Sequence, residues 1–202
     1  KAGKTRALLK GKISFNANNI VRYPFKPFDI RMAYLDRELQ PLFSRPSPEL
    51  LQQRFSGNCF LVARESGNVE PKSPPFMFSR LVCDYHTFAV EAKHIPFLLK
   101  TGLARAEKNA MLPGMGGDKI TPTANLSASA RGYLASFGLP DPDTDSATVE
   151  LIWMHALAIG YSPAYLSENA DGLGQDWPRI PLPKEKAAFL ASASLGRKVA
   201  AL

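Results

Sequence analysis

The sequence predicts an α+β fold, with a sheet-bearing N-terminal part of mixed or antiparallel strands and a C-terminal helical cluster. Aromatic and β-branched runs recur between residues 13 and 99, whereas helix start and stop signals follow one another from residue 126 onward. Strands do not alternate with long helices, as they would in a doubly wound parallel sheet. We therefore divide the 202 residues into a basic, strand-rich part, 1–119, and a helical subdomain packing on it, 120–202.

The first two strands are expected at Ile20–Phe25 and Phe28–Leu35, which are rich in aromatic and β-branched residues. Within the second, Ile30, Met32 and Tyr34 alternate with Asp29, Arg31 and Ala33. Pro24 and Pro27 cannot donate ladder hydrogen bonds, so they indicate an edge or a break and not a central strand. Further strands are expected at Asn58–Arg64, Phe76–Asp84, Thr87–Glu91 and Ile95–Leu99.

Helix signals are sparse before residue 120. Ser47 as N-cap, with Pro48 in the first turn, predicts a short helix within Ser47–Phe55. A second short helix is expected at Leu103–Met111, followed by a loop at Pro113–Pro122.

Four helices are expected in the C-terminal part. They are Leu126–Phe137, closed by Gly138; Ala147–Ile159, capped by Asp145 or Ser146 and stopped by Gly160; a helix opened by Ser162 and Pro163 that ends before Gly172; and Lys184–Ala201. The last is predicted to be amphipathic, with an apolar face made of Ala187, Leu190, Ala191, Leu195 and Val199.

The net charge of +7 belongs wholly to the first part. Residues 1–119 carry 19 Lys and Arg against 10 Asp and Glu, whereas residues 120–202 carry 6 against 8. An excess of this kind is typical of a surface that binds a polyanion. The alternative is that a pI of about 9.5 only keeps the protein soluble.

Composition also bounds the cellular context. The longest apolar run is far shorter than the ~20 residues of a membrane span, so no membrane partner is expected. Cys59 and Cys83 fall in predicted strands and are expected as buried thiols in the cytoplasm, since Cys-x-x-Cys spacing for a metal is missing. The chain starts at Lys1 with a cationic segment, and we expect it to be a piece of a longer polypeptide.

No catalytic motif is complete. The glycine-rich stretch Pro113–Lys119 lacks phosphate-loop spacing. The string Ser73–Phe76 has Ser where the (N/D)PP(Y/F) loop of adenine methyltransferases needs Asn or Asp, so no methyl transfer and no cofactor are expected within this chain.

Two weaker catalytic arrangements stay open. Asp84 and His86 would share a face of a strand, where the carboxylate could orient the imidazole as a base. Asp84, Glu91 and Lys93, with Asp29, offer the ingredients of a magnesium-dependent nuclease.

Binding chemistry fits the residues better. Cationic side chains in or beside the predicted strands are interleaved with aromatic ones, which suits contacts to phosphates and base edges. The predicted DNA-binding residues are Arg22, Lys26, Arg31, Arg64, Arg80, His86 and Lys93. Arg31 and Arg80 have an alternative role as structural partners of Asp29 and Asp84.

Five strings follow one another along the chain: Tyr23–Tyr34 (YPFKPFDIRMAY), Leu61–Arg64, Phe76–His86, Ile95–Leu99 and Met154–Pro183, the last ending in WPRIPLP. In this order they resemble one bacterial family, the C-terminal specificity (target-recognition) region of type ISP restriction–modification enzymes and related single-chain adenine-N6 DNA methyltransferases. The first string is similar to the family's YRPFDxRxxYY element. Lys26 replaces the usual Arg, Leu35 the second Tyr, and Gly160 a His.

The resemblance implies a DNA target-recognition domain that directs adenine-N6 methylation by a methyltransferase domain upstream in the same chain, where S-adenosylmethionine would bind. Its partners would be double-stranded DNA and that upstream domain. Because recognition residues differ between enzymes that read different sites, the less family-like segments 65–72 and 103–119 are expected to read bases. The alternatives are a module that couples domains and touches DNA only incidentally, and the nuclease.

Overall fold

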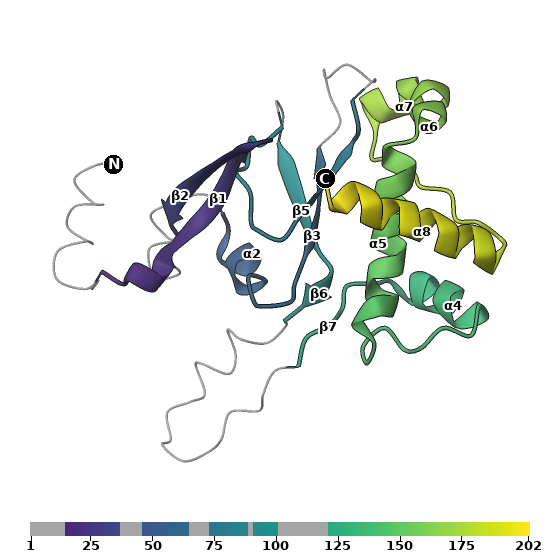
Figure 1. Cartoon of the computed structure of the whole chain (residues 1–202), viewed down its shortest axis with the longest axis horizontal. Coiled ribbons are helices and arrows are strands. Elements are labelled where there is room, and N and C mark those ends of the chain that lie inside the picture. The colour runs from purple at the N-terminus through teal and green to yellow at the C-terminus, as the bar shows by residue number, and fades with distance from the viewer. Residues whose placement is uncertain (1–14, 37–45, 65–72, 89–90, 101–120) are drawn as a thin grey trace, which may run out of the picture.

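A computed structural model describes residues 15–36, 46–64, 73–88, 91–100 and 121–202 (Figure 1). It confirms the α+β class with a helical C-terminal cluster. The strands are β1 (Ile20–Lys26), β2 (Asp29–Tyr34), β3 (Phe60–Arg64), β4 (Phe76–Ser79), β5 (Ala92–Pro96), β6 (Leu98–Leu99) and β7 (Thr123–Ala124). The helices are η1 (Ala17–Asn19, a 3₁₀ turn), α2 (Pro48–Gln52), α4 (Ala128–Ser136), α5 (Ser146–Gly160), α6 (Pro163–Glu168), α7 (Ala170–Gln175) and α8 (Lys186–Ala200).

A three-stranded antiparallel sheet, ordered β4-β3-β5, separates two hydrophobic cores. Every residue of β3 is buried, and alternate side chains enter opposite cores. Leu61 and Ala63 join the larger core with α5 and α8, whereas Phe60 and Val62 join a smaller core with Tyr23. Helices α5 and α8 therefore cover one face of the sheet, whereas the β1–β2 ribbon and α2 pack toward the other (Figure 1).

The β1–β2 ribbon is a two-stranded antiparallel hairpin with a two-residue turn, Pro27 and Phe28. Its register is irregular between Pro24 and Lys26, and it is paired with no third strand in the described part of the chain, which agrees with the predicted edge position. The backbone N–H of Asp84 donates to the Pro24 carbonyl (2.8 Å), so the ribbon is joined to the loop after β4.

The larger core lies between α5 and α8. His155 is almost fully buried there, with Nε2 2.8 Å from the Pro181 carbonyl and Nδ1 2.8 Å from the Ser192 hydroxyl. Because a carbonyl only accepts, Nε2 carries the proton and Nδ1 accepts from Ser192. His155 thereby joins the WPRIPLP segment to both helices.

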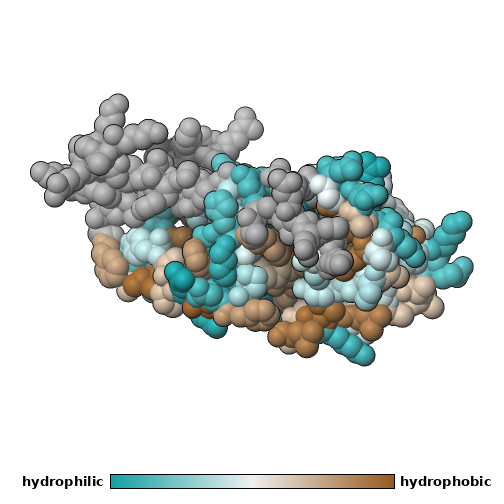
Figure 2. Space-filling model, turned by 90° about the horizontal axis from the view of Figure 1, so that it is seen from above, coloured by the Kyte–Doolittle hydropathy of each residue, from teal (hydrophilic) through white to brown (hydrophobic). Residues whose placement is uncertain are grey.

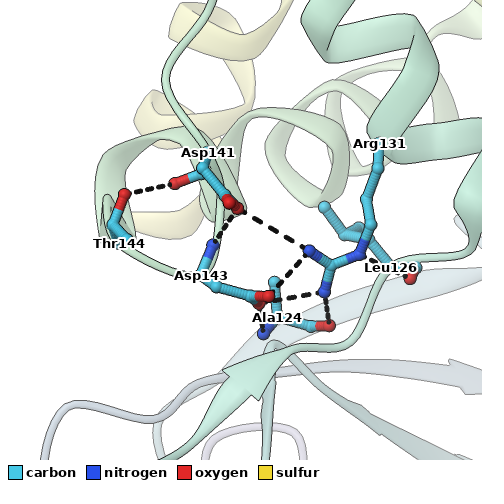
Figure 3. A network of polar contacts seen from close by, with 6 residues as sticks. All are labelled: Ala124, Leu126, Arg131, Asp141, Asp143 and Thr144. Carbon is cyan, nitrogen blue, oxygen red and sulfur yellow. Dashed lines mark hydrogen bonds and ion pairs between the residues drawn. The ribbon is translucent and has the colours of Figure 1, made fainter.

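A second polar network fixes the entrance to the helical cluster (Figure 3). The Arg131 guanidinium donates to both Asp143 carboxylate oxygens (2.9 and 3.0 Å) and to the carbonyls of Ala124 and Leu126. Asp143 also accepts from the Ala124 N–H at 2.7 Å, so β7, α4 and the turn before α5 share one arginine. Hydrogen bonds to the Arg131 guanidinium lower the pKa of Asp143, which therefore remains ionised.

Several predicted boundaries were wrong. β4 ends at Ser79, and the expected strand at Thr87–Glu91 begins instead as a turn, because residues 80–88 form a loop held to β1 and β5. Gly160 is the last residue of α5 and not its stop: a side chain there would meet Phe76, whose Cδ2 lies 2.6 Å from an added Cβ. Gly172 lies inside α7. The helix expected at 103–111 lies outside the described residues, as does most of the loop after it.

The apolar face of the last helix was predicted only in part: Leu190 and Val199 pack against the larger core, but Ala187, Ala191 and Leu195 are exposed. In α8 the buried residues are Phe189, Ala193 and Gly196, whereas Leu195 is 57% exposed. Because α5 lies close to α8, the face of α8 that carries the small residues Ala193 and Gly196 is turned toward α5, and Leu195 points outward.

Candidate nucleic-acid interface

Six residues, three with cationic side chains and three with aromatic rings, form a cation–aromatic row between the ribbon and β5. In order along the row they are Arg31, Phe25, Lys26, His86, Tyr85 and Lys93. The Arg31 guanidinium carbon lies 4.0 Å from the centre of the Phe25 ring, and the Lys26 ammonium lies 5.6 Å from it. Cation–π contacts of this kind hold both cations over the same ring.

The row continues from the ribbon into the loop after β4. Lys26 Nζ donates a hydrogen bond to the His86 carbonyl, and the His86 and Tyr85 rings meet edge to face with centres 4.8 Å apart. Lys93 Nζ, on β5, lies 5.7 Å from the Tyr85 ring centre. Segments about 60 residues apart in sequence thus present one connected set of cations.

Asp84 holds this arrangement together. Its carboxylate accepts from the Tyr23 hydroxyl (3.3 Å) and from the backbone N–H of His86 (2.8 Å). Burial, and then the nearby Asp84 charge, raise the pKa of Tyr23, so this hydroxyl remains a donor. The carboxylate engages the backbone of His86 and not its imidazole, so the predicted orientation of the ring by Asp84 is not formed.

Two cations of the row are paired with neighbouring carboxylates. Arg31 binds Asp29 at 2.8 Å and Lys93 binds Glu91 at 3.0 Å, and all four side chains are solvent-exposed. The alternative of Asp29 as partner for Arg31 is therefore correct in this structure. Exposed ion pairs of this kind contribute only about 0–1 kcal/mol, so exchanging the carboxylate for a phosphate costs little.

The other three predicted residues lie apart from the row. Arg22 is exposed on the opposite face of the ribbon, across from Met32. Arg64 is only 6% exposed at the end of β3, and burial lowers its pKa. Arg80 is exposed, but it reaches toward the helical side, with Nη1 3.9 Å from the sulfur of Cys59. The structure brings together Lys26, Arg31, His86 and Lys93.

Sequence reasoning gave no specific role to the turn residue Phe28. Its φ is +67°, and it is the one non-glycine residue with positive φ in the described part of the chain. The side chain is fully exposed. The sequence does contain a signal for this strained position. Pro27 lies between two strand patterns, and the turn position after such a proline ordinarily takes Gly or Asn, whereas here it is Phe28. On the face seen in Figure 2, hydrophobic and hydrophilic patches of the described residues lie side by side.

A hollow of about 470 Å³ lies beside the row, lined by Tyr23, Leu50, Tyr85, Lys93 and His94 among others.

Within the described ranges, no group of three or more His, Cys, Asp or Glu side chains is placed to hold a metal ion. Both cysteines are free and buried there, and burial raises the pKa of Cys83 to about 11, so its thiol stays protonated. None of the described helices is long and apolar enough to cross a membrane.

His94 makes the smaller core sensitive to acid. Its Nε2 accepts from the Cys83 N–H at 2.9 Å, which requires a neutral ring, and burial lowers its pKa to about 4. Because the unfolded chain binds a proton near pH 6.5, we expect the free energy of unfolding to fall as pH drops from 6.5 to 4, by up to about 3 kcal/mol.

Urea unfolding at several pH values measures this fall. The variant His94→Gln keeps an acceptor for Cys83 but cannot titrate, so its profile should be flatter, with the remaining slope due partly to His155, whose pKa burial also lowers. Identical profiles for the two proteins would contradict the role given to His94.

Three comparisons place this geometry among known proteins. A family model described as "Type ISP C-terminal specificity domain" matches residues 1–202. No curated protein matches the sequence. One similar solved structure is the cryoEM structure of a DrdV–DNA complex, with a TM-score of 0.64 and 22% identity over 95% of this chain and 16% of that chain.

Another is a nuclease-deletion mutant of the Type ISP restriction-modification enzyme LlaGI in complex with a DNA substrate mimic. Its TM-score is 0.55, with 19% identity over 97% of this chain and 15% of that chain. At these identities the two structures establish a shared fold. The present chain spans about a sixth of the length of each.

Proposed function

The chain belongs to the family of Type ISP C-terminal specificity domains, and from this membership we propose that it recognises a DNA target for a bacterial restriction–modification methyltransferase. An upstream domain of the same polypeptide would then bind S-adenosylmethionine and methylate adenine N6. Both similar structures were determined with DNA or a DNA mimic bound, which supports the same role here. A cytoplasmic location follows from this proposal.

The observation that carries the proposal is the cation–aromatic row. It lies on the face of the sheet opposite α5 and α8, where Tyr23 of the ribbon and Leu50 of α2 also pack. Its cations come from β1, β2 and β5, and the loop after β4 adds the rings of Tyr85 and His86. Arg and Lys supply most of the affinity of such proteins through phosphate contacts, which position the duplex for base readout elsewhere. Segment 65–72 starts at the end of β3, so we propose it, with segment 103–119, as the source of base contacts.

The two parts of the chain would divide the work. The strand-rich part, 1–119, would contact DNA, while the helical subdomain, 120–202, buttresses the sheet from behind through α5 and α8. We propose that the outer surface of this subdomain packs against the neighbouring domain. Trp177 and Leu182 of the WPRIPLP segment are exposed there and offer apolar contact area.

The nuclease alternative receives no support from the described residues. Asp84 is engaged by Tyr23 and by the backbone of His86, and Glu91 is bound to Lys93. These carboxylates do not converge on a common metal position.

We expect the 202-residue chain to bind a duplex of about 30 base pairs with an affinity that falls steeply with salt. Contacts from Lys26, Arg31 and Lys93 alone predict a slope of about −3 in a plot of log K against log salt concentration. Fluorescence anisotropy at several salt concentrations measures this slope. An affinity that does not change with salt, or an absence of binding at the lowest salt, would refute the proposed DNA interface.

A further inference from the structure

The turn of the ribbon exposes an aromatic ring at an energetic cost to the folded state. Phe28 occupies a left-handed backbone conformation (φ +67°) that ordinarily takes Gly or Asn, and its side chain is fully exposed. The position therefore carries backbone strain of about 1–3 kcal/mol, together with unburied apolar area, and contacts within the described part of the fold offset neither. Strain of this kind concentrates where a protein clamps a ligand.

The surrounding structure holds the backbone of Phe28 in place. Pro27 restricts the backbone before it, and Lys26 is paired with Asp29 across the turn. The Lys26 ammonium is in turn bound to the His86 carbonyl of the loop after β4. Phe28 thus projects from a braced turn, and little backbone entropy remains to be lost when it binds.

The charges around Phe28 indicate what it meets. Lys26 precedes it and Arg31 follows it, and both belong to the cation–aromatic row. The single acidic residue of the ribbon, Asp29, is occupied by Arg31. An exposed aromatic ring between two cations suits a target that has both negative charge and flat apolar faces, which describes the base stack of DNA.

We propose, on the basis of the DNA-binding function proposed above, that Phe28 is a wedge that enters the base stack of bound DNA while Lys26 and Arg31 hold the flanking phosphates. Insertion of an apolar side chain unstacks a base step and bends the duplex. The wedge would read no sequence, since every base has a π-face. It would instead lower the cost of distorting the duplex at the target.

A duplex with a central abasic site tests this without knowledge of the recognised sequence, because the gap in the stack is already open. We expect the wild-type chain to bind the abasic duplex about tenfold more tightly than the intact one, in line with the energy of stacking an aromatic ring on a base. Phe28→Trp should keep the preference. Phe28→Gly should lose it and bind the two duplexes equally, with the salt dependence of wild type, since the phosphate contacts remain.

Phe28→Gly also separates the wedge from a folding effect. Glycine accepts the positive φ, so this variant should melt at the wild-type temperature or above it. Met32→Ala is the matched control, because Met32 is 64% exposed on the same ribbon but lies away from the turn, and it should keep the abasic preference.

The outcomes are distinct. Salt-dependent binding with equal affinity for both duplexes would overturn the wedge, leave the DNA-binding function standing, and assign Phe28 to a contact with protein. An abasic preference that survives in Phe28→Gly would overturn it too. A wild-type chain that binds neither duplex would overturn the DNA-binding function and the wedge together.

Discussion

Reversing the charges of Lys26 and Arg31 together, as Lys26→Glu and Arg31→Glu, should lower the affinity for duplex DNA by on the order of 100-fold at low salt. Both cations stand over the Phe25 ring, so the double variant places two carboxylates where phosphates would lie. The slope of log K against log salt should shrink by about 2, one for each lost phosphate contact. Fluorescence anisotropy over a salt series provides both numbers.

A control with the same change in net charge separates local contact from general attraction. Arg197 and Lys198 lie in the last turn of α8, both exposed, on the helical side of the sheet. Arg197→Glu with Lys198→Glu should change affinity by less than about threefold, because charges more than a Debye length from the duplex are screened. Equal losses in the two double variants would contradict an interface at the row and leave only a diffuse electrostatic effect.

Local pattern predicted the parts of this interface that depend on sequence neighbours. The alternation through Ile20–Tyr34 and the two prolines identified an edge hairpin, and the apolar run at Phe60–Arg64 identified a buried strand. Local pattern could not predict the contact between Lys26 and His86, because that contact depends on how the loop after β4 folds back onto β1. Arg64 looked like a surface cation because a charge usually ends a buried strand in solvent, yet here the strand end is covered.

The apolar face of α8 shows a different reason for failure. A reading by periodicity gives weight to large side chains, so Leu195 was assigned to the core and Gly196 was ignored. Two helices can approach closely only where small residues face each other, because the side-chain volume at the contact sets the interaxial distance. Gly196 is buried against the backbone of α5 at Met154, and its importance follows from that contact.

Gly196→Ala should therefore destabilise the fold by about 3 kcal/mol or more, a large loss for a single methyl group. A Cβ at this position would lie 2.6 Å from the Met154 carbonyl carbon and closer still to its oxygen. Those atoms belong to helical backbone, so they cannot move aside as a side chain would. Helix α8 would have to shift, and Phe189 and Ala193 would then lose their packing in the larger core. Urea unfolding followed by circular dichroism measures the change.

Gly132→Ala is the matched control, since Gly132 also lies inside a helix, α4, but is exposed with no atom within 4 Å of an added Cβ. There the better helix propensity of alanine should stabilise the protein by up to about 1 kcal/mol. The same substitution thus has opposite signs at two helical glycines, because Gly196 is buried against the backbone of α5 and Gly132 faces open space. A neutral effect of Gly196→Ala would mean that α5 and α8 do not cross this closely, and the sheet would lack the rigid support that positions the cation–aromatic row.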